Sequence, residues 1–185
     1  MPDAASPAMS VPVIETERLI LRGHVREDFA DIAAMWADPA VVRYISGTPL
    51  AEEEAWGKFL RGFGFWQVLG YGYWLIAERA GGRFVGEAGF GLFKRAVEPP
   101  LGEVPEMGWS LAPWAHGQGY ATEAVAAAAA WGDAHLGADR TCCLISPDNT
   151  PSIRLAERVG FRETARTDYK GGPAVVYHRV RGGGS

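Results

Sequence analysis

Cysteine is scarce in this sequence: two of the 185 residues, Cys142 and Cys143, and they are adjacent. Neighbouring side chains on a strand point to opposite faces, so these two thiols are not expected to share a metal ion or to pair readily. The pair instead predicts a reducing compartment, the cytoplasm, with two small apolar residues in the core.

Long hydrophobic runs are also missing. The longest nearly continuous one, Ala124–Trp131, is far shorter than the roughly 20 residues that a membrane-spanning helix needs. The first residues, MPDAASPAMSVPV, have neither the basic start nor the apolar stretch of a secretory signal. We therefore expect a soluble protein that does not contact a membrane.

Neither sign of charge dominates, because 18 basic residues stand against 22 acidic ones, a formal net charge of −4. Without a broad basic field, the chain is not expected to bind nucleic acid. The mild acidity leaves basic or amine-bearing partners open without selecting them.

Two kinds of catalytic site find no support. The histidines are scattered, and none stands at ligand spacing from another histidine or a cysteine, so no metal site is expected (His24, His116, His135 and His178). No Gly-x-Ser-x-Gly turn presents a serine nucleophile.

The length and composition predict one globular domain over residues 12–181, after a flexible terminus at 1–11 and before a flexible tail at 182–185. Helices are expected between Arg26 and Asp38, from Ala51 onward, and over Ala121–His135 and Ser152–Val159. Strands are expected over 17–22, 71–77, 83–93, 104–111, 141–145, 162–168 and 174–180. This order predicts a mixed α/β (α+β) fold around one central sheet, not an alternating Rossmann series.

The sharpest local signal is a glycine-rich turn that leads from a strand into an alanine-rich helix, Trp114–Glu123. Glycines let backbone N–H groups converge on a ligand, and a helix start adds unpaired donors, so the turn suits phosphate or pyrophosphate. A P-loop would need a lysine that is absent here, and the spacing fits a dinucleotide fingerprint poorly. A helix start without any ligand stays open.

The segment His116-Gly117-Gln118-Gly119-Tyr120-Ala121 resembles the acetyl-CoA loop of the GNAT N-acetyltransferases, Arg/Gln-x-x-Gly-x-Gly/Ala. Its continuation to Ala124 is similar to the branch that includes the ribosomal-protein N-terminal (alanine/serine) acetyltransferases. Two further segments agree with that branch, 16–22 with Glu27-Asp28, and 147–152 running on to Val159-Gly160-Phe161. The similarity spans about residues 14–181. It departs at His116, where the family has arginine or glutamine.

The resemblance implies a GNAT fold, a mostly antiparallel twisted sheet of about six or seven strands, splayed at the cofactor site and flanked by about four helices. Acetyl-CoA is then the cosubstrate, without a metal. Its pyrophosphate would lie on the loop, on backbone N–H groups of Gly117, Gln118, Gly119, Ala121 and Thr122, beside His116 and Tyr120. Its pantetheine would run along Trp109–Leu111.

The resemblance also implies direct attack of an acceptor amine on the thioester in a ternary complex. The N–H of Leu111 would hold the developing oxyanion, and Glu106 would act as the base. Glu106 could equally be a solvent-facing strand residue, with Glu103 or water as weaker candidates. The tyrosine that many members use as acid is replaced by Ala156.

Asn149 and Ser152 match the Asn-x-x-Ser of the ribosomal-type branch, which implies a contact of Asn149 with CoA and a place for Ser152 near its sulfur. Both could instead be ordinary helix caps. Glu123 fits best as a partner of the helix dipole.

The acceptor is not determined. An aromatic stretch could be core or substrate wall (Phe63, Phe65, Trp66, Tyr71, Tyr73 and Trp74, with Tyr44 before it). A protein N-terminus, a small polyamine or amino acid, and an aminoglycoside-like drug all stay open. The alternatives to an enzyme are a non-catalytic CoA-binding sensor or interaction module and a binder of other nucleotides. A homodimer is consistent with the resemblance.

Overall fold

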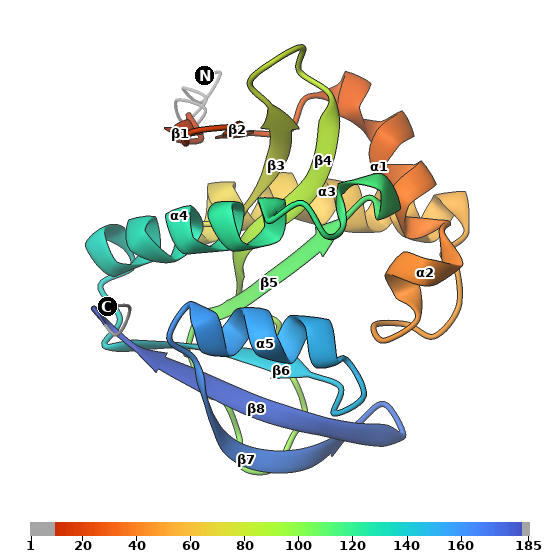
Figure 1. Cartoon of the computed structure of the whole chain (residues 1–185). Helices are drawn as coiled ribbons and strands as arrows, with labels where there is room; N and C mark the ends of the chain where they lie inside the picture. Colours follow the sequence, from red (N-terminus) through yellow and green to blue (C-terminus); the bar gives the residue numbers. More distant parts are fainter. Residues whose placement is uncertain (1–9, 183–185) are drawn as a thin grey trace, which may run out of the picture.

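The computed structural model describes residues 10–182, in which one eight-stranded sheet has the order β1-β2-β3-β4-β5-β6-β8-β7 (Figure 1). The strands are β1 Ile14–Glu15, β2 Leu19–Arg22, β3 Tyr73–Glu78, β4 Phe84–Gly91, β5 Glu106–Leu111, β6 Arg140–Ile145, β7 Arg162–Tyr169 and β8 Gly172–Val180. The α-helices are α1 Phe29–Trp36, α2 Pro39–Val42, α3 Glu52–Leu69, α4 Tyr120–His135 and α5 Thr150–Arg158.

All pairs in this sheet are antiparallel except β5 with β6, so the expected mixed, mostly antiparallel α/β fold is confirmed. The sheet has one strand more than the expected six or seven, and that extra strand is β1, which has only two residues. The fifth helix is α2, which Pro39 begins: proline suits a first helical turn, and the Asp38 carboxylate accepts the N–H of Ala40 at 2.8 Å.

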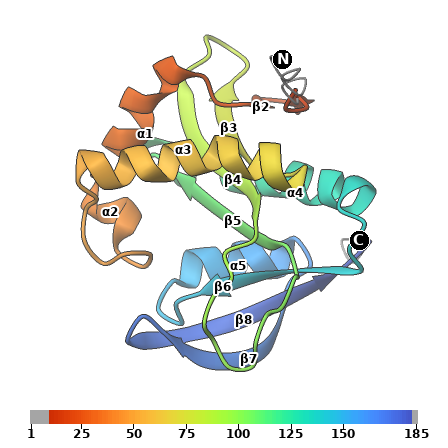
Figure 2. The same ribbon diagram turned by 180° about the vertical axis from the view of Figure 1, so that it is seen from behind.

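Helices cover both faces of the sheet. α4 and α5 lie on the face toward the viewer in Figure 1, and α3 crosses the opposite face, which Figure 2 turns to the front. β3 serves both layers: Leu75 and Ala77 pack with α1–α3, whereas Trp74 and Ile76 pack with α4. The alternation of a strand thus divides the core into two clusters.

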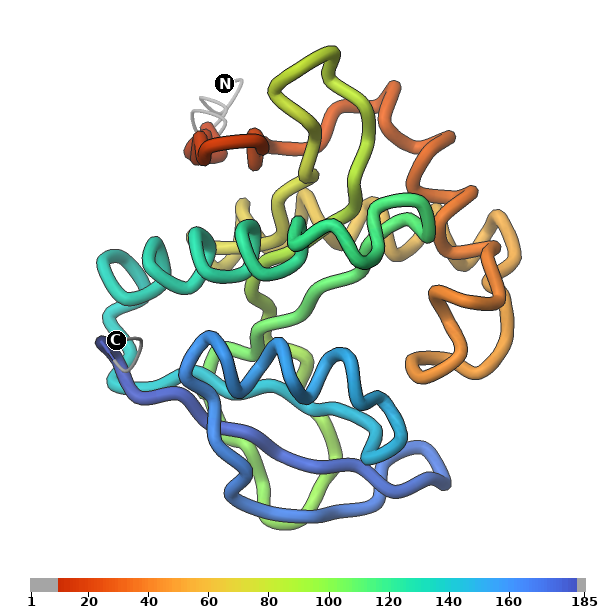
Figure 3. The backbone as a smooth tube through the Cα atoms, viewed as in Figure 1, coloured from red at the N-terminus to blue at the C-terminus, as the bar shows by residue number. Residues whose placement is uncertain are grey.

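The sheet opens between β5 and β6. These parallel neighbours share one register pair, Glu106 with Cys142, and the N–H of Cys142 donates to the carbonyl of Pro105 at 3.0 Å. Beyond that point the two strands diverge, while the chain runs from β5 through α4 into β6 and then α5 (Figure 3). The splayed sheet is the feature expected at the cofactor site.

The spacing of apolar residues after Ala51 predicts a buried face at Trp56, Phe59, Leu60 and Phe63, and for α3 this prediction is wrong in part. Phe59 is buried as expected, but Trp56, Leu60 and Phe63 are 38%, 47% and 41% exposed. The buried stripe runs instead through Ala55, Phe59, Gly62 and Trp66. Gly62 faces His24, and a Cβ added there would lie 3.6 Å from its ring, an ordinary van der Waals contact.

Residues 1–9 and 183–185, most of the two expected flexible ends, lie outside the described residues. Val11, also assigned to a flexible terminus, packs against the core, and the neighbouring carbonyl of Pro12 accepts the indole N–H of Trp74 at 2.8 Å. Both cysteines are buried and unpaired. Among residues 10–182, no helix is long and apolar enough to cross a membrane.

Candidate functional site

The glycine-rich turn has the backbone that its sequence predicts. Gly117 and Gly119 adopt φ of +75° and +79°, and Gly119 caps the start of α4. A Cβ at Gly117 would meet nothing within 4 Å, so glycine is needed there for its left-handed conformation. The carbonyl of Gln118 accepts from the guanidinium of Arg18 at 2.9 Å, which fixes the loop.

Glu123 anchors the first turn of α4 to the chain before β2. Its carboxylate accepts from the Thr16 hydroxyl at 2.6 Å, and from the backbone N–H and Nε of Arg18 at 2.8 and 2.7 Å. Burial would raise the pKa of Glu123, but these hydrogen bonds and the charge of Arg18 lower it below its usual value. Glu123 is therefore held as a carboxylate in a positioning role.

His116 bonds to the backbone at the end of β5, where its Nε2 donates to the carbonyl of Leu111 at 3.0 Å. The side chain that departs from the family pattern thus ties the loop to the strand that precedes it. This hydrogen bond uses the His116 ring and the Leu111 carbonyl, so it does not involve the backbone N–H groups of Gly117 and Gly119.

The free edge of β5 presents backbone donors to the opening between β5 and β6. Ala112 donates its N–H to Val85 at 2.9 Å, and Leu111 lies opposite Gly86. Because antiparallel bonds alternate along a strand, the N–H groups of Trp109 and Leu111 point away from β4, toward the opening. Both are placed to bind an extended ligand as a further strand would.

A cavity of about 660 Å³ runs from this opening to the α3 face of the sheet. Four of the sequence-predicted site residues line it: Glu106, Trp109, Asn149 and Ser152. The glycine-rich turn and Leu111 lie outside its lining, on the α4 side. The structure therefore brings the predicted residues to two adjoining places, not into one pocket.

Asn149 and Ser152 have the geometry of a helix cap. The Asn149 side-chain oxygen accepts the N–H of Ser152 at 3.3 Å, and Pro151 follows in the first turn of α5. Ala156, where many family members carry a tyrosine, is fully buried.

Glu106 is 6% exposed, so it is not a solvent-facing strand residue. Both of its oxygens accept from Arg95, each at 2.6 Å. Burial would lower the pKa of Arg95, but the hydrogen bonds and charge of Glu106 raise it above its usual value, so Arg95 stays charged. Glu103, the weaker candidate, is an exposed partner of Lys94.

Sequence reasoning missed a second buried carboxylate in the cavity, Glu87 on β4. Its oxygens accept from His24 Nε2 at 2.8 Å and from the Trp36 indole N–H at 3.1 Å. Burial would raise the pKa of Glu87, but these bonds and the nearby charges of His24 and Lys58 lower it. The available signal was one glutamate within an otherwise apolar strand, Val85-Gly-Glu-Ala-Gly-Phe90.

Both carboxylates face α3. Glu87 lies opposite Ser110, and Gly91 lies opposite Glu106; facing residues of neighbouring strands project from the same side of a sheet. From the predicted aromatic stretch, Phe65 and Tyr73 line the cavity, as does Tyr44. Trp66 and Trp74 instead pack in the core, with ring centroids 4.9 Å apart.

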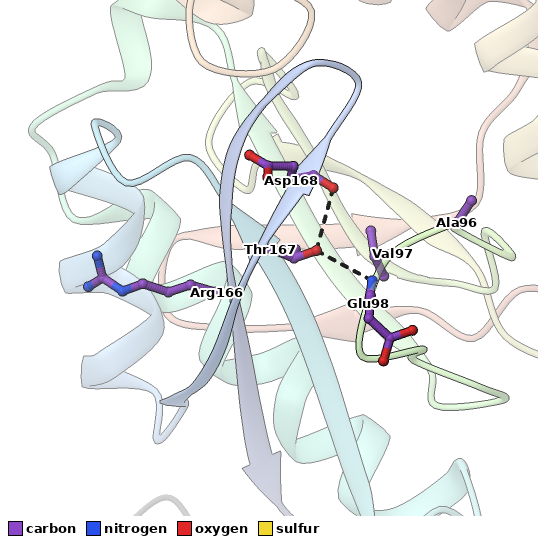
Figure 4. Close-up of a pocket in the computed structure, with 6 residues that line it drawn as sticks. All are labelled: Ala96, Val97, Glu98, Arg166, Thr167 and Asp168. Atoms are coloured by element: carbon purple, nitrogen blue, oxygen red, sulfur yellow. Dashed lines mark hydrogen bonds between the residues drawn. The ribbon is translucent and has the colours of Figure 1, made fainter.

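A separate hollow lies between the β4–β5 connection and β7, lined by Ala96, Val97, Glu98, Arg166, Thr167 and Asp168 (Figure 4). In it the Thr167 hydroxyl accepts the N–H of Glu98 at 3.4 Å. None of the predicted site residues lines this hollow. This hydrogen bond links the β4–β5 connection, which carries Arg95, to β7. Residues 10–182 contain no group of three or more metal-ligating side chains.

Comparison with known proteins agrees with this geometry. Residues 18–162 match the family described as acetyltransferase (GNAT) domain. The uncharacterised N-acetyltransferase p20 of Bacillus licheniformis is 28% identical over 157 residues, which cover 84% of this chain and 85% of p20.

Solved structures give the same result. A chain from Bordetella pertussis assigned to the GNAT acetyltransferases is 32% identical, with a TM-score of 0.81 and coverage of 91% of this chain and 99% of that one. The ribosomal L7/L12 N-acetyltransferase RimL, solved with coenzyme A, shares the fold at 17% identity, with a TM-score of 0.75 and coverage of 91% and 98%. The chain described here belongs to the GNAT family of acetyltransferases.

Proposed function

We propose that this protein is an acetyl-CoA-dependent N-acetyltransferase that moves the acetyl group to a primary amine by direct attack in a ternary complex. The observation that carries this proposal is the opening between β5 and β6, where backbone donors border a cavity that holds two carboxylates. The pyrophosphate of acetyl-CoA would bind the backbone N–H groups of 117–122, and its pantetheine would extend along Trp109–Leu111.

The thioester carbonyl oxygen would accept a hydrogen bond from the backbone N–H of Leu111 or of Trp109, both of which face the opening between β5 and β6. A preorganised donor of this kind lowers a barrier by about 3 kcal/mol. As the amine nitrogen bonds to the carbonyl carbon and the carbon–sulfur bond breaks, the sulfur needs a proton or a hydrogen bond. Ser152, on the cavity wall, is our candidate for that contact, and Asn149 contacts CoA beside it.

The amine must reach the thioester unprotonated, which is easier for an N-terminus of pKa about 8 than for a lysine of about 10.4. Glu106 is the proposed proton acceptor, directly or through water. Arg95 already donates to both of its oxygens, so the amine or a bridging water would have to approach a remaining lone pair of the carboxylate. The resemblance to the ribosomal-protein branch makes a protein N-terminus one acceptor class, and a small amine is the other.

Calorimetric binding of acetyl-CoA, with ADP and free CoA for comparison, tests the cofactor. Gly117→Ala should weaken acetyl-CoA binding at least about tenfold, a change of about 1.4 kcal/mol. Gly81→Ala is the matched control, because Gly81 also has a left-handed φ of +89° and open space, but lies in the β3–β4 turn. Equal binding by both variants would contradict the loop assignment, and tight ADP binding would favour another nucleotide.

Thiol release with a panel of amines then tests turnover, and Glu106→Gln and Ser152→Ala should lower kcat while CoA still binds. CoA binding without acetylation of any amine would favour the non-catalytic sensor, a rival that the engaged oxygens of Glu106 support.

We further propose a cytoplasmic location, which suits two buried free thiols. A homodimer stays a prediction that sedimentation tests.

A further inference from the structure

Four cations converge on the part of the cavity that α3 covers. We call Lys58, Arg61, Arg95 and Lys170 the cationic cluster; they come from α3, the β4–β5 connection and the β7–β8 turn, and all four line the cavity. No sequence motif predicts this set, because the fold brings together residues more than a hundred positions apart.

Two aromatic rings hold the cluster together. The Phe93 ring has the Arg61 and Arg95 guanidinium carbons 5.7 and 4.7 Å from its centroid. The Tyr169 ring has Arg95 at 4.7 Å and the Lys170 ammonium at 5.6 Å. Cations on shared rings are kept in place but not neutralised.

Three carboxylates line the cavity against these four cations, so one positive charge is in excess. Glu106 pairs with Arg95, and Glu87 is taken by His24 and Trp36. Glu54 accepts the N–H of Ala51 at the start of α3. Among residues 10–182, the ion pairs within 4.0 Å do not include the other three members of the cluster.

Lys58 is a half-buried member of the cluster. Its ammonium lies 3.9 Å from the Trp36 ring centroid, beside the indole that donates to Glu87. Burial lowers the pKa of Lys58 to about 8. The charge of Glu87 acts in the opposite direction, and the charges of the other three cations add to the effect of burial. The cluster therefore repels a further positive charge in the cavity and attracts a negative one.

The phosphates of acetyl-CoA do not account for the cluster. The glycine-rich turn that would bind them opens α4, which lies on the other face of the sheet from α3 (Figures 1 and 2). Residues of α3 therefore face the acceptor side.

We propose that the acceptor is a small amine that also carries an anionic group, a carboxylate or a phosphate, and that the cationic cluster binds this group. The inference rests on the proposed acetyl transfer and names its substrate class. The amine nitrogen forms the new bond to the acetyl carbon, the carbon–sulfur bond breaks, and the proton lost by nitrogen ends on the CoA thiol. The positive field also disfavours the protonated amine, which cannot attack.

The test compares acceptors matched in shape and different in charge: amino acids, the corresponding amino acid amides, aminoalkyl phosphates and a linear polyamine. Release of the CoA thiol at saturating acetyl-CoA gives kcat/KM for each acceptor, calculated from the concentration of its unprotonated amine. At least one anionic amine should exceed its uncharged counterpart about tenfold or more, and the carboxylate and phosphate series identify the anion. An amide or the polyamine as the best acceptor would overturn the proposal.

Variants locate the effect. Arg61→Gln and Lys170→Gln should each raise KM for the anionic acceptor about tenfold and leave kcat and the amide kinetics within twofold. The control is Arg158→Gln, an exposed cation in the last turn of α5 outside the cavity, which should change neither. Equal losses with charged and uncharged acceptors would contradict a role in anion binding.

A readout without turnover separates this proposal from the proposed function. In calorimetry with CoA present, N-acetyl amino acids should bind more tightly than N-acetyl amino acid amides, and Arg61→Gln should abolish the difference. If no amine is acetylated but this preference holds, the transferase assignment fails and the anion site stands. If acetylation occurs but neither preference is seen, only the anion site fails.

Discussion

At the scale of single residues, the cavity depends on one glycine that faces a tyrosine. A Cβ at Gly108 would lie 2.2 Å from the hydroxyl oxygen of Tyr73, a group on the cavity wall whose pKa burial raises. Gly108→Ala should therefore cost about 1–3 kcal/mol of unfolding free energy, measured by urea denaturation. The double variant with Tyr73→Phe should recover most of it, since the hydroxyl makes the clash; an additive double variant would contradict this explanation.

Glu87 gives a pH-dependent prediction. Its folded-state pKa lies below the ordinary 4.5, so its carboxylate adds stability that is complete above that pH and is lost as the pH falls through the folded-state value. Glu87→Gln should lower the unfolding free energy by about 2 kcal/mol at neutral pH. The difference from the unsubstituted protein should shrink below about pH 4.

Urea denaturation over a series of pH values measures this difference. Glu98→Gln, at an exposed glutamate, serves as the control and should change stability by less than about 0.5 kcal/mol at any pH. A Glu87→Gln difference that is constant with pH would show that the lost interaction does not involve the charge.

At the scale of elements, the free edge of β5 predicts an alternating exchange pattern. The N–H of Ser110 points to β4 and should exchange slowly, whereas those of Trp109 and Leu111 point into the opening and should exchange faster. Acetyl-CoA should slow these two amides and leave Ser110 almost unchanged. Hydrogen exchange followed by NMR measures all three, and uniform protection along β5 without ligand would contradict the assignment.

Elements with local signals could be predicted from the sequence, and those set by tertiary contact could not. The glycine-rich turn and α4 were found because glycine, alanine and helix-start chemistry act within a few residues. The buried stripe of α3 was misplaced by one position around the helix, because spacing allows two neighbouring stripes and only packing against His24 and the sheet selects one.

The candidate site divides in the same way. The family resemblance implies roles for Glu106, Trp109, Asn149 and Ser152, and these four residues line one cavity. Glu87 and the cationic cluster have no local pattern, since their importance comes from the pairing of β4 with β5 and from turns that approach α3. The helix-cap geometry of Asn149 is confirmed, and its contact with CoA stays a prediction.

At the scale of the whole molecule, the two parts of the sheet meet at one register pair, and a ligand in the opening would bridge them. Acetyl-CoA at a hundred times its Kd should therefore add about 2.7 kcal/mol to the unfolding free energy. For a chain of this size, the melting temperature should rise by roughly 5 to 10 °C. Thermal denaturation with and without acetyl-CoA tests this, and an equal rise with ADP would point to the nucleotide alone.

The edge of β5 that faces the opening would bind a ligand through backbone N–H groups, and every residue except proline has such a group. Substitutions at Trp109 and Leu111 that preserve packing would therefore leave the recognition surface chemically the same. Mutational tolerance should be high for side-chain identity along this edge and low for the left-handed glycines of the turn. Under the proposed function, the residues around α3 can change with the acceptor while the backbone donors for acetyl-CoA stay the same.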